Sequence, residues 1–104
     1  MWYIQSMLPT LTALAEPNRL RIIELLREGP RPVGEIAARL QLRQPQVSKH
    51  LRVLSEAGLV AHEAQGTRHL YRLDPEGVAQ IRDYLDGVWN KALASFKRRT
   101  ETQT

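Results

Sequence analysis

The chain has 104 residues, a length that suits one domain, and its 42% of hydrophobic residues is typical of a globular protein rather than a disordered one. Fifteen Lys and Arg residues against 11 Asp and Glu give a formal net charge of +4, which favours a polyanionic partner over a neutral one. The chain contains no cysteine, which excludes disulfides, cysteine-ligated zinc sites and cysteine nucleophiles.

Neither a membrane span nor a secretory signal is expected. No apolar run approaches the ~20 residues that a membrane span needs. The first ten residues, MWYIQSMLPT, have no basic flank and no long apolar core of the kind a signal peptide has. We therefore expect a soluble cytoplasmic protein.

The N-terminal third is predicted to be helical. Leucines on one face indicate a short first helix over about residues 9–15. Pro17 and Asn18 suit the start of a second helix, and Gly29 suits its C-cap. Residues 29–32, Gly-Pro-Arg-Pro, are predicted to form a turn.

Two short helices with a tight connection are predicted next. Residues 33–40 form the third helix and residues 41–43 the connection. The fourth helix lies in QPQVSKHLRVLSEAGLV, residues 44–60, where Pro45 is tolerated in the first turn and Gly58 closes the helix. This spacing is that of a helix-turn-helix.

The chain then changes to a hairpin and a last helix. Residues 59–65 and 68–73 are predicted strands with Gly66-Thr67 between them, and Asp74 and Pro75 suit the N-cap and first position of a helix. That helix carries an apolar stripe of Val78, Ile81, Leu85, Val88, Trp89, Ala92 and Phe96. The order predicts a mainly α fold with a small β-hairpin, a winged helix-turn-helix.

The fourth helix has an apolar stripe beside a donor-rich face. On a helical wheel, Val47, Leu51 and Leu54 fall within about one third of the circle. The neighbouring face carries Gln44, Pro45, Ser48, Lys49 and Arg52. An amphipathic helix of this kind fits the major groove of B-DNA, with its N-terminal residues nearest the base edges. The alternative is a solvated polar face, which the preceding helix and the following hairpin make less favourable.

Each donor has a chemically plausible DNA target. Gln44 can pair with adenine, Lys49 can donate to guanine, and Ser48 can reach a base or a phosphate. Arg52 lies further along the helix, where a phosphate is the expected target, and Gln46 is a weaker candidate because it sits off the centre of the face.

The hairpin tip, GTRH, adds two further candidates. Gly66 permits the turn, Arg68 can enter a minor groove, and His69 can contact a phosphate. The alternative is an ordinary exposed turn.

The run QPQVSKHLRVLSEAGLV, with GTRHLYRLD after it and LAEPNRLRIIELL before it, closely resembles the ArsR-type winged helix-turn-helix repressors over about residues 8–96 of the single domain 1–104. The resemblance implies a dimeric bacterial repressor on a partly palindromic operator, with the first and last helices at the dimer interface. It also implies base or phosphate contacts at Gln44, Ser48 and Lys49 and a wing contact at Arg68. Together with the candidates taken from the residues themselves, the predicted DNA contacts are Arg43, Gln44, Gln46, Ser48, Lys49, Arg52, Arg68 and His69. The interface candidates are Leu8, Leu11, Leu85, Val88, Trp89, Ala92 and Phe96.

The residues themselves also favour a dimer. A monomer this small has little core left to cover the stripe that contains Trp89 and Phe96, whereas a second subunit would bury it. The alternative is that the stripe packs on the first two helices.

The chain departs from the metal-sensing members that it resembles. One group has a Cys-x-Cys pair at positions that correspond to Pro32 and Gly34, which cannot ligate. Another group has Asp and His pairs on the last helix, where this chain has Asp83 and Asp86 but no histidine. We therefore expect no metal, no cofactor and membership of the non-metal branch, with an unknown effector.

The remaining polar residues carry weaker expectations. His50 is expected to pack or to bond to the backbone, and His62 and His69 are expected to be diagonal neighbours on the hairpin, about 7–8 Å apart at Cβ. Two imidazoles do not close a metal site. Arg43 stands where Ser or Thr would cap the fourth helix, so either the cap shifts or Arg43 turns outward.

Other function classes remain as alternatives. A winged-helix module that binds protein or RNA is the second hypothesis. An enzyme is disfavoured because the sequence has no Ser-His-Asp set, no paired carboxylates in a plausible pocket and no Gly-rich phosphate loop.

Overall fold

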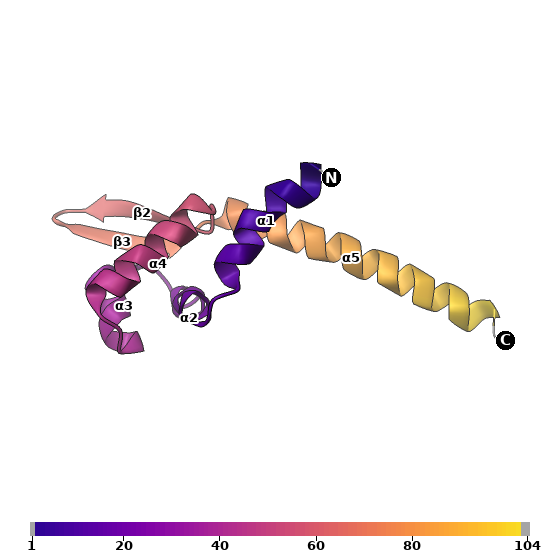
Figure 1. The fold of residues 1–104 in the computed structure, drawn as a ribbon, viewed down its shortest axis with the longest axis horizontal. Helices are drawn as coiled ribbons and strands as arrows, with labels where there is room; N and C mark the ends of the chain where they lie inside the picture. Colours follow the sequence, from indigo (N-terminus) through magenta and orange to yellow (C-terminus); the bar gives the residue numbers. More distant parts are fainter. Residues whose placement is uncertain (1, 103–104) are drawn as a thin grey trace.

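The computed structural model describes residues 2–102 as five helices and three short strands (Figure 1). In chain order these are α1 (Trp2–Leu14), α2 (Pro17–Leu26), β1 (Arg31–Pro32), α3 (Val33–Leu40), α4 (Gln44–Glu56), β2 (Val60–Gln65), β3 (Arg68–Leu73) and α5 (Pro75–Thr102). The order confirms the predicted winged helix-turn-helix, including the two helices with their short connection, the hairpin and the final helix. No helix in this described part of the chain is both long and apolar enough to cross a bilayer.

The predicted start of the first helix is wrong. Pro9 lies inside α1 rather than at its beginning. A proline inside a helix removes one N–H···O bond, and contacts with the rest of the protein offset that loss here. Met7 and Thr10 are both buried, and the Thr10 hydroxyl donates to the carbonyl of Ala57, 3.3 Å away.

The predicted turn over residues 29–32 is wrong in its second half. Arg31 and Pro32 form β1, which pairs with β3 at the edge of an antiparallel sheet of order β1-β3-β2. An edge position suits Pro32, which has no N–H to donate. The end of the second helix is also earlier than predicted, because α2 stops at Leu26 and Arg27 is its C-cap, with Gly29 in the following turn.

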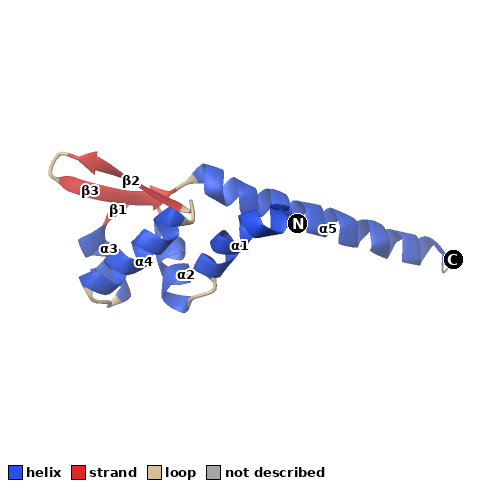
Figure 2. Cartoon of the chain, turned by 45° about the horizontal axis from the view of Figure 1, so that its top comes forward, coloured by secondary structure: helices blue, strands red, loops and turns tan. Residues whose placement is uncertain are grey.

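The core forms where α2, α3 and α4 meet the base of the hairpin (Figure 2). The predicted apolar stripe of α4 is confirmed, since Val47, Leu51 and Leu54 are at most 1% exposed. The most deeply buried large side chains are Ile22, Ile36, Leu51, Leu54, Leu59 and Val47. Docking this stripe fixes which face of α4 remains in solvent.

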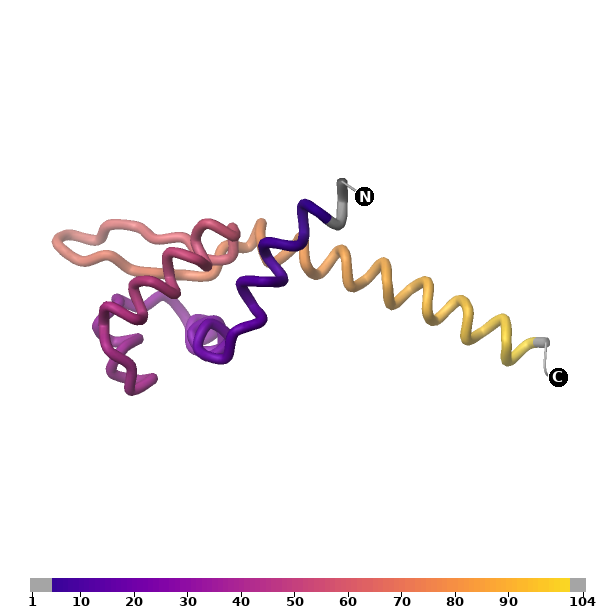
Figure 3. The backbone as a smooth tube through the Cα atoms, in the orientation of Figure 1, coloured from indigo at the N-terminus to yellow at the C-terminus, as the bar shows by residue number. Residues whose placement is uncertain are grey.

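The last helix is joined to the body at its first turn. The Asp74 carboxylate accepts from the N–H of Glu76 at 3.0 Å, and the Asp74 N–H donates to the carbonyl of Leu59 at 2.9 Å. Gly77 is buried directly against the backbone of Gly58. Beyond this anchor, α5 extends away from the body and makes the molecule 64 × 28 × 22 Å (Figure 3).

Candidate nucleic-acid interface

The turn between α3 and α4 sets the position of α4. Gln41 adopts the left-handed conformation, with φ 57° and ψ 43°, and its N–H donates to the carbonyl of Ala38. The Leu42 N–H donates to the carbonyl of Ala37 at 3.0 Å, and the Leu42 side chain packs against the core. These bonds close α3 and turn the chain sharply without a glycine.

The start of α4 leaves Arg43 outside any cap bond. Arg43 is the N-cap residue in extended conformation, its side chain makes no capping bond, and it is exposed. Of the two alternatives, a shifted cap or an outward-turned Arg43, the structure therefore shows the second. Gln44, which follows it, lies close to the start of α3, with its side-chain Oε1 4.0 Å from the position of a Cβ built at Gly34.

The donor-rich face of α4 is exposed, as its pattern predicted. The five candidates on this helix are all solvent-exposed, and among the described residues the structure gives none of their side chains a hydrogen bond or an ion pair: Gln44, Gln46, Ser48, Lys49 and Arg52. The buried stripe holds the helix in place while these donors stay available. Their contact with DNA remains a prediction.

The hairpin confirms the expected histidine neighbours and separates two candidates. His62 is opposite Tyr71, and Ala64 is opposite His69, so the two imidazoles are diagonal neighbours with ring centroids 5.7 Å apart. Because side chains alternate along a strand, Arg68 lies on the other face from His69. Both side chains are exposed.

A groove runs between α4 and the inner face of the hairpin. It is lined by Ser48, Leu51, Arg52, Ser55, His62 and Tyr71, and its volume is about 310 Å³. We call it the wing–helix groove. Sequence reasoning identified Ser48 and Arg52 but missed Ser55, His62 and Tyr71 as functional candidates. Strand alternation would have placed His62 and Tyr71 on one face, but nothing local shows that α4 packs beside it.

The comparisons with known proteins agree with this geometry. Residues 14–63 match a family model described as a helix-turn-helix domain. The HTH-type transcriptional regulator Rv2034 of Mycobacterium tuberculosis is 43% identical over 91 residues, which is 88% of this chain and 85% of that protein. A homodimeric winged helix-turn-helix DNA-binding domain, Mb0332 from Mycobacterium bovis, described as a possible ArsR-family transcriptional regulator, is 32% identical with a TM-score of 0.70, over 86% of this chain and 83% of that one.

The chain belongs to the ArsR family of helix-turn-helix transcriptional regulators. The HTH-type transcriptional repressor SmtB of Mycobacterium tuberculosis is 45% identical over 75% of this chain, which spans only 56% of that repressor. Membership of a family of regulators confirms the prediction that this ArsR-family chain is not an enzyme.

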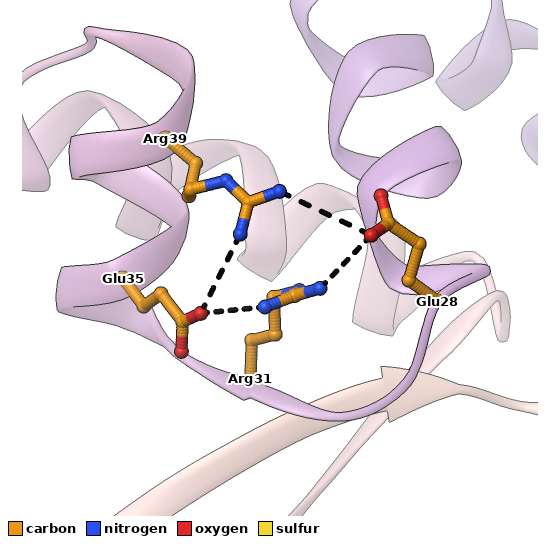
Figure 4. A network of polar contacts seen from close by, with 4 residues as sticks. All are labelled: Glu28, Arg31, Glu35 and Arg39. Atoms are coloured by element: carbon orange, nitrogen blue, oxygen red, sulfur yellow. Dashed lines mark hydrogen bonds and ion pairs between the residues drawn. The ribbon is translucent and has the colours of Figure 1, made fainter.

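Several arginines of this ArsR-family chain are bonded within the protein. Figure 4 shows Arg31 between the carboxylates of Glu28 and Glu35, at 3.3 and 2.5 Å, and Arg39 at 3.9 Å from each of the same carboxylates. Arg31 is only 16% exposed at its side chain. This network joins the turn after α2, strand β1 and helix α3, so it helps to hold α3 in place.

His50 on α4 is only 18% exposed at its side chain, which fits the expectation that it packs. Its Nδ1 also lies 3.7 Å from a carboxylate oxygen of Glu16, a contact that the sequence did not predict. Glu16 is the N-cap of α2 and accepts from the Arg19 N–H at 2.8 Å. Burial raises the pKa of the Glu16 carboxyl, but the backbone N–H groups of Arg19 and Asn18 and the charges on His50 and Arg19 lower it by more, so the pKa lies below its usual value.

Of the four positions that the sequence analysis compared with metal sites, Pro32 and Gly34 have no ligating side chain, whereas Asp83 and Asp86 are carboxylates. Pro32 caps α3 and Gly34 lies in its first turn, and Asp83 on α5 pairs with Arg82 at 3.3 Å. Within residues 2–102, no three side chains of His, Cys, Asp or Glu lie together as a metal site.

The predicted dimerisation residues are exposed in the single chain. Exposure is 56% for Leu8, 37% for Leu11, 53% for Leu85, 50% for Val88, 63% for Trp89 and 61% for Phe96, and Ala92 is also exposed. The alternative in which this stripe packs on the first two helices of the same chain therefore does not hold for most of α5. A partner for the stripe remains a prediction.

Proposed function

We propose that the chain is a homodimeric transcriptional repressor that binds a partly palindromic operator, with α4 of each protomer in a major groove. One observation carries this proposal: α4 is held by a fully buried stripe while its adjacent face presents five exposed polar side chains without partners among the described residues. A helix placed in this way can enter a groove about 12 Å wide.

We assign roles by position along α4 and the hairpin. Gln44, Ser48 and Lys49, in the first half of the helix, contact base edges or phosphates. Arg52 contacts a phosphate, and Arg68 on the outer face of the wing reaches the adjacent minor groove. Arg43 and Gln46 flank the helix start, and His69 completes the set on the inner face.

The dimer is supported by the apolar stripe of α5 and its neighbour α1. These two helices contact each other near the body, and Figure 2 shows α5 continuing well beyond α1. A contiguous exposed stripe with Trp89 and Phe96 marks a protein–protein interface on a small regulator. The similar Mb0332 domain is homodimeric, which supports a dimer here as well.

The proposal is tested by the salt dependence and sequence preference of DNA binding. We expect nanomolar-range binding to the duplex upstream of its own gene, weakening steeply with salt as condensed counterions are released. The double variant Lys49→Ala/Arg68→Ala should lose operator binding and remain a folded dimer. The charge-matched control, Arg27→Ala/Lys91→Ala, should bind normally, because Arg27 faces Glu24 on α2 and Lys91 lies on α5.

The second candidate, a protein- or RNA-binding winged helix, makes a different prediction. It gives weak, unsaturable binding that does not distinguish the upstream duplex from random DNA. Equal affinity for both duplexes, or intact operator binding by Lys49→Ala/Arg68→Ala, would contradict the repressor proposal.

We also propose that operator release does not depend on a metal. The support is that the chain has no cysteine and that Pro32 and Gly34 occupy the positions of the Cys-x-Cys pair. Titrating zinc, nickel or arsenite into the DNA complex should leave the affinity unchanged. We propose further that residues 8–96 act as one DNA-binding and dimerisation unit in the cytoplasm, where the operator is.

A further inference from the structure

The inner face of the hairpin carries a row of imidazole and phenol side chains beside α4. His62 lies between the other two rings, with its centroid 5.7 Å from that of His69 and 5.4 Å from that of Tyr71. His62 and Tyr71 line the wing–helix groove, and His69 continues the same face towards the wing tip. All three rings lie on the face of the hairpin that is next to α4.

The opposite wall of the groove is polar and cationic. Ser48, Arg52 and Ser55 follow one another along α4 at helical spacing and line the groove. Across residues 2–102, the structure gives no hydrogen bond or ion pair to Arg52, His62 or His69. A groove with several free donors and a permanent positive charge, next to the proposed reading helix, is chemically matched to an anion.

The charged groups around the imidazoles favour an anion rather than a cation. From α4, Arg52 faces the groove, with Glu56 one turn further along the helix and exposed. From β3, the neutral phenol of Tyr71 stands beside His62, and from β1 the next residue in the cross-strand row is Arg31, whose charge is already matched by Glu28 and Glu35. No carboxylate therefore lines the groove to compensate added positive charge.

We propose that the wing–helix groove binds a phosphodiester of the operator backbone, with His62 and His69 as proton-dependent donors that act together with Arg52. The inference rests on the proposed function, since the anion is part of the DNA that α4 reads. Imidazole gains a second N–H donor and a positive charge on protonation, and it does so between about pH 5 and pH 8. A bound phosphate favours that protonated form, so DNA binding takes up protons.

The consequence is an operator affinity that rises as the pH falls. In the complex, the negative phosphate stabilises positive charge on the two adjacent imidazoles. We expect the apparent Kd to fall by about tenfold from pH 8 to pH 6 at constant ionic strength.

The test uses the full-length dimer, its upstream duplex, and fluorescence anisotropy across pH 6 to pH 8. The chain has three histidines, so the variant set is complete. His62→Gln/His69→Gln should bind with the same affinity at pH 6 as at pH 8, because glutamine is a neutral donor at both pH values, and should therefore lose the increase that the wild type shows. His50→Gln is the matched control and should keep the increase, because His50 faces Glu16 and not the groove.

Proton uptake provides a second, direct readout. Calorimetric titration in buffers of different ionisation enthalpy should show protons taken up on binding at pH 6.5 by the wild type and by His50→Gln, and not by the double variant. A pH response that survives in His62→Gln/His69→Gln, or one that disappears in His50→Gln, overturns the inference. Tight operator binding with no pH response also overturns it while leaving the repressor proposal intact, whereas binding to no duplex at any pH contradicts the repressor proposal itself.

Discussion

The joint between α5 and the body allows a sharp test of how the fold is held together. A Cβ built at Gly77 would lie 1.8 Å from the carbonyl oxygen and 2.6 Å from the carbonyl carbon of Gly58. The obstructing atoms are backbone, so no side-chain rotation relieves the clash. For Gly77→Ala, restoring a contact distance of about 3.4 Å requires the two segments to separate by roughly 1.6 Å.

The expected cost follows from two opposing effects. Overpacking of this kind costs about 3 kcal/mol or more when the backbone must move, and the bond from the Asp74 N–H to the Leu59 carbonyl is stretched as well. Alanine recovers about 1 kcal/mol because it is a better helix former than glycine. We therefore expect Gly77→Ala to lose about 2 kcal/mol of unfolding free energy, measured by urea denaturation at fixed protein concentration.

The same helix supplies a matched control. Gly87 has no atom within 4 Å of the built Cβ, so Gly87→Ala should be stabilising by up to about 1 kcal/mol. Gly77→Ala should also weaken the dimer, because α5 carries most of the exposed apolar stripe. If Gly77→Ala were as stable as Gly87→Ala, the close approach of the two backbones in the folded protein would be refuted.

Three further predictions concern the core, the α2 cap and the subunit interface. Leu54 is 0% exposed, and Leu54→Ala should lower the unfolding free energy in urea by roughly 2–5 kcal/mol, the range for buried leucines. The loss should be the same at two protein concentrations, because Leu54 lies in the core of one chain. Glu16→Ala should lower the unfolding free energy by about 1 kcal/mol at neutral pH, where the Glu16 carboxylate that caps α2 is charged. Because the pKa of Glu16 is lowered in the folded state, the stabilisation by the carboxylate is lost as the pH falls through the acid range, and the difference between Glu16→Ala and the wild type should shrink there. Glu16→Asn should preserve the cap. Trp89→Ala/Phe96→Ala should raise the dimer dissociation constant by at least about tenfold in sedimentation velocity with helicity preserved, and an unchanged constant would remove these residues from the interface.

The centre of the fold was predictable because its signals are local. The apolar period of α4, the Pro45 near its start and the break at Gly58 fall within one short stretch of sequence. Asp74 and Pro75 mark the start of α5 in the same way, and the structure confirms both helices. Where helix propensity, capping residues and hydrophobic pattern all favour the same helix, tertiary contacts rarely change its position.

The errors occur where distant contacts override a local rule. Pro9 reads as a helix start, yet α1 continues through it because Thr10 bonds to Ala57, 47 positions along the chain. The sequence predicts a turn at Arg31 and Pro32, yet these residues pair with β3. A two-residue strand is too short to have a hydrophobic pattern that predicts such pairing. The C-cap of α2 is Arg27, two residues before the predicted Gly29, because a glycine near a helix end need not be the C-cap itself.

The candidate site was predictable only on the side where it is a helix face. The donors of α4 follow from the wheel, but the groove needs the hairpin register and the packing of β2 on α4. The sequence therefore predicted Lys49 as a DNA contact, but it did not show that His62 lines the same groove as Arg52. The opposite directions of Arg68 and His69 follow from strand alternation alone, whereas the packing of β2 on α4 decides which of the two faces lies towards α4.

The distribution of the basic residues links the fold to the proposed DNA complex. The arginines of α2, β1 and α3 are bonded inside the protein to carboxylates or carbonyls: Arg19, Arg21, Arg27, Arg31 and Arg39. The cations of α4 and the hairpin tip have no such partner among the described residues: Arg43, Lys49, Arg52 and Arg68. Moving a cation of the first group to a phosphate would break an existing contact, whereas a cation of the second group exchanges only water and counterions. An excess of four positive charges is therefore sufficient for a DNA-binding surface, because the acidic residues neutralise the supporting helices and leave the reading face unbalanced.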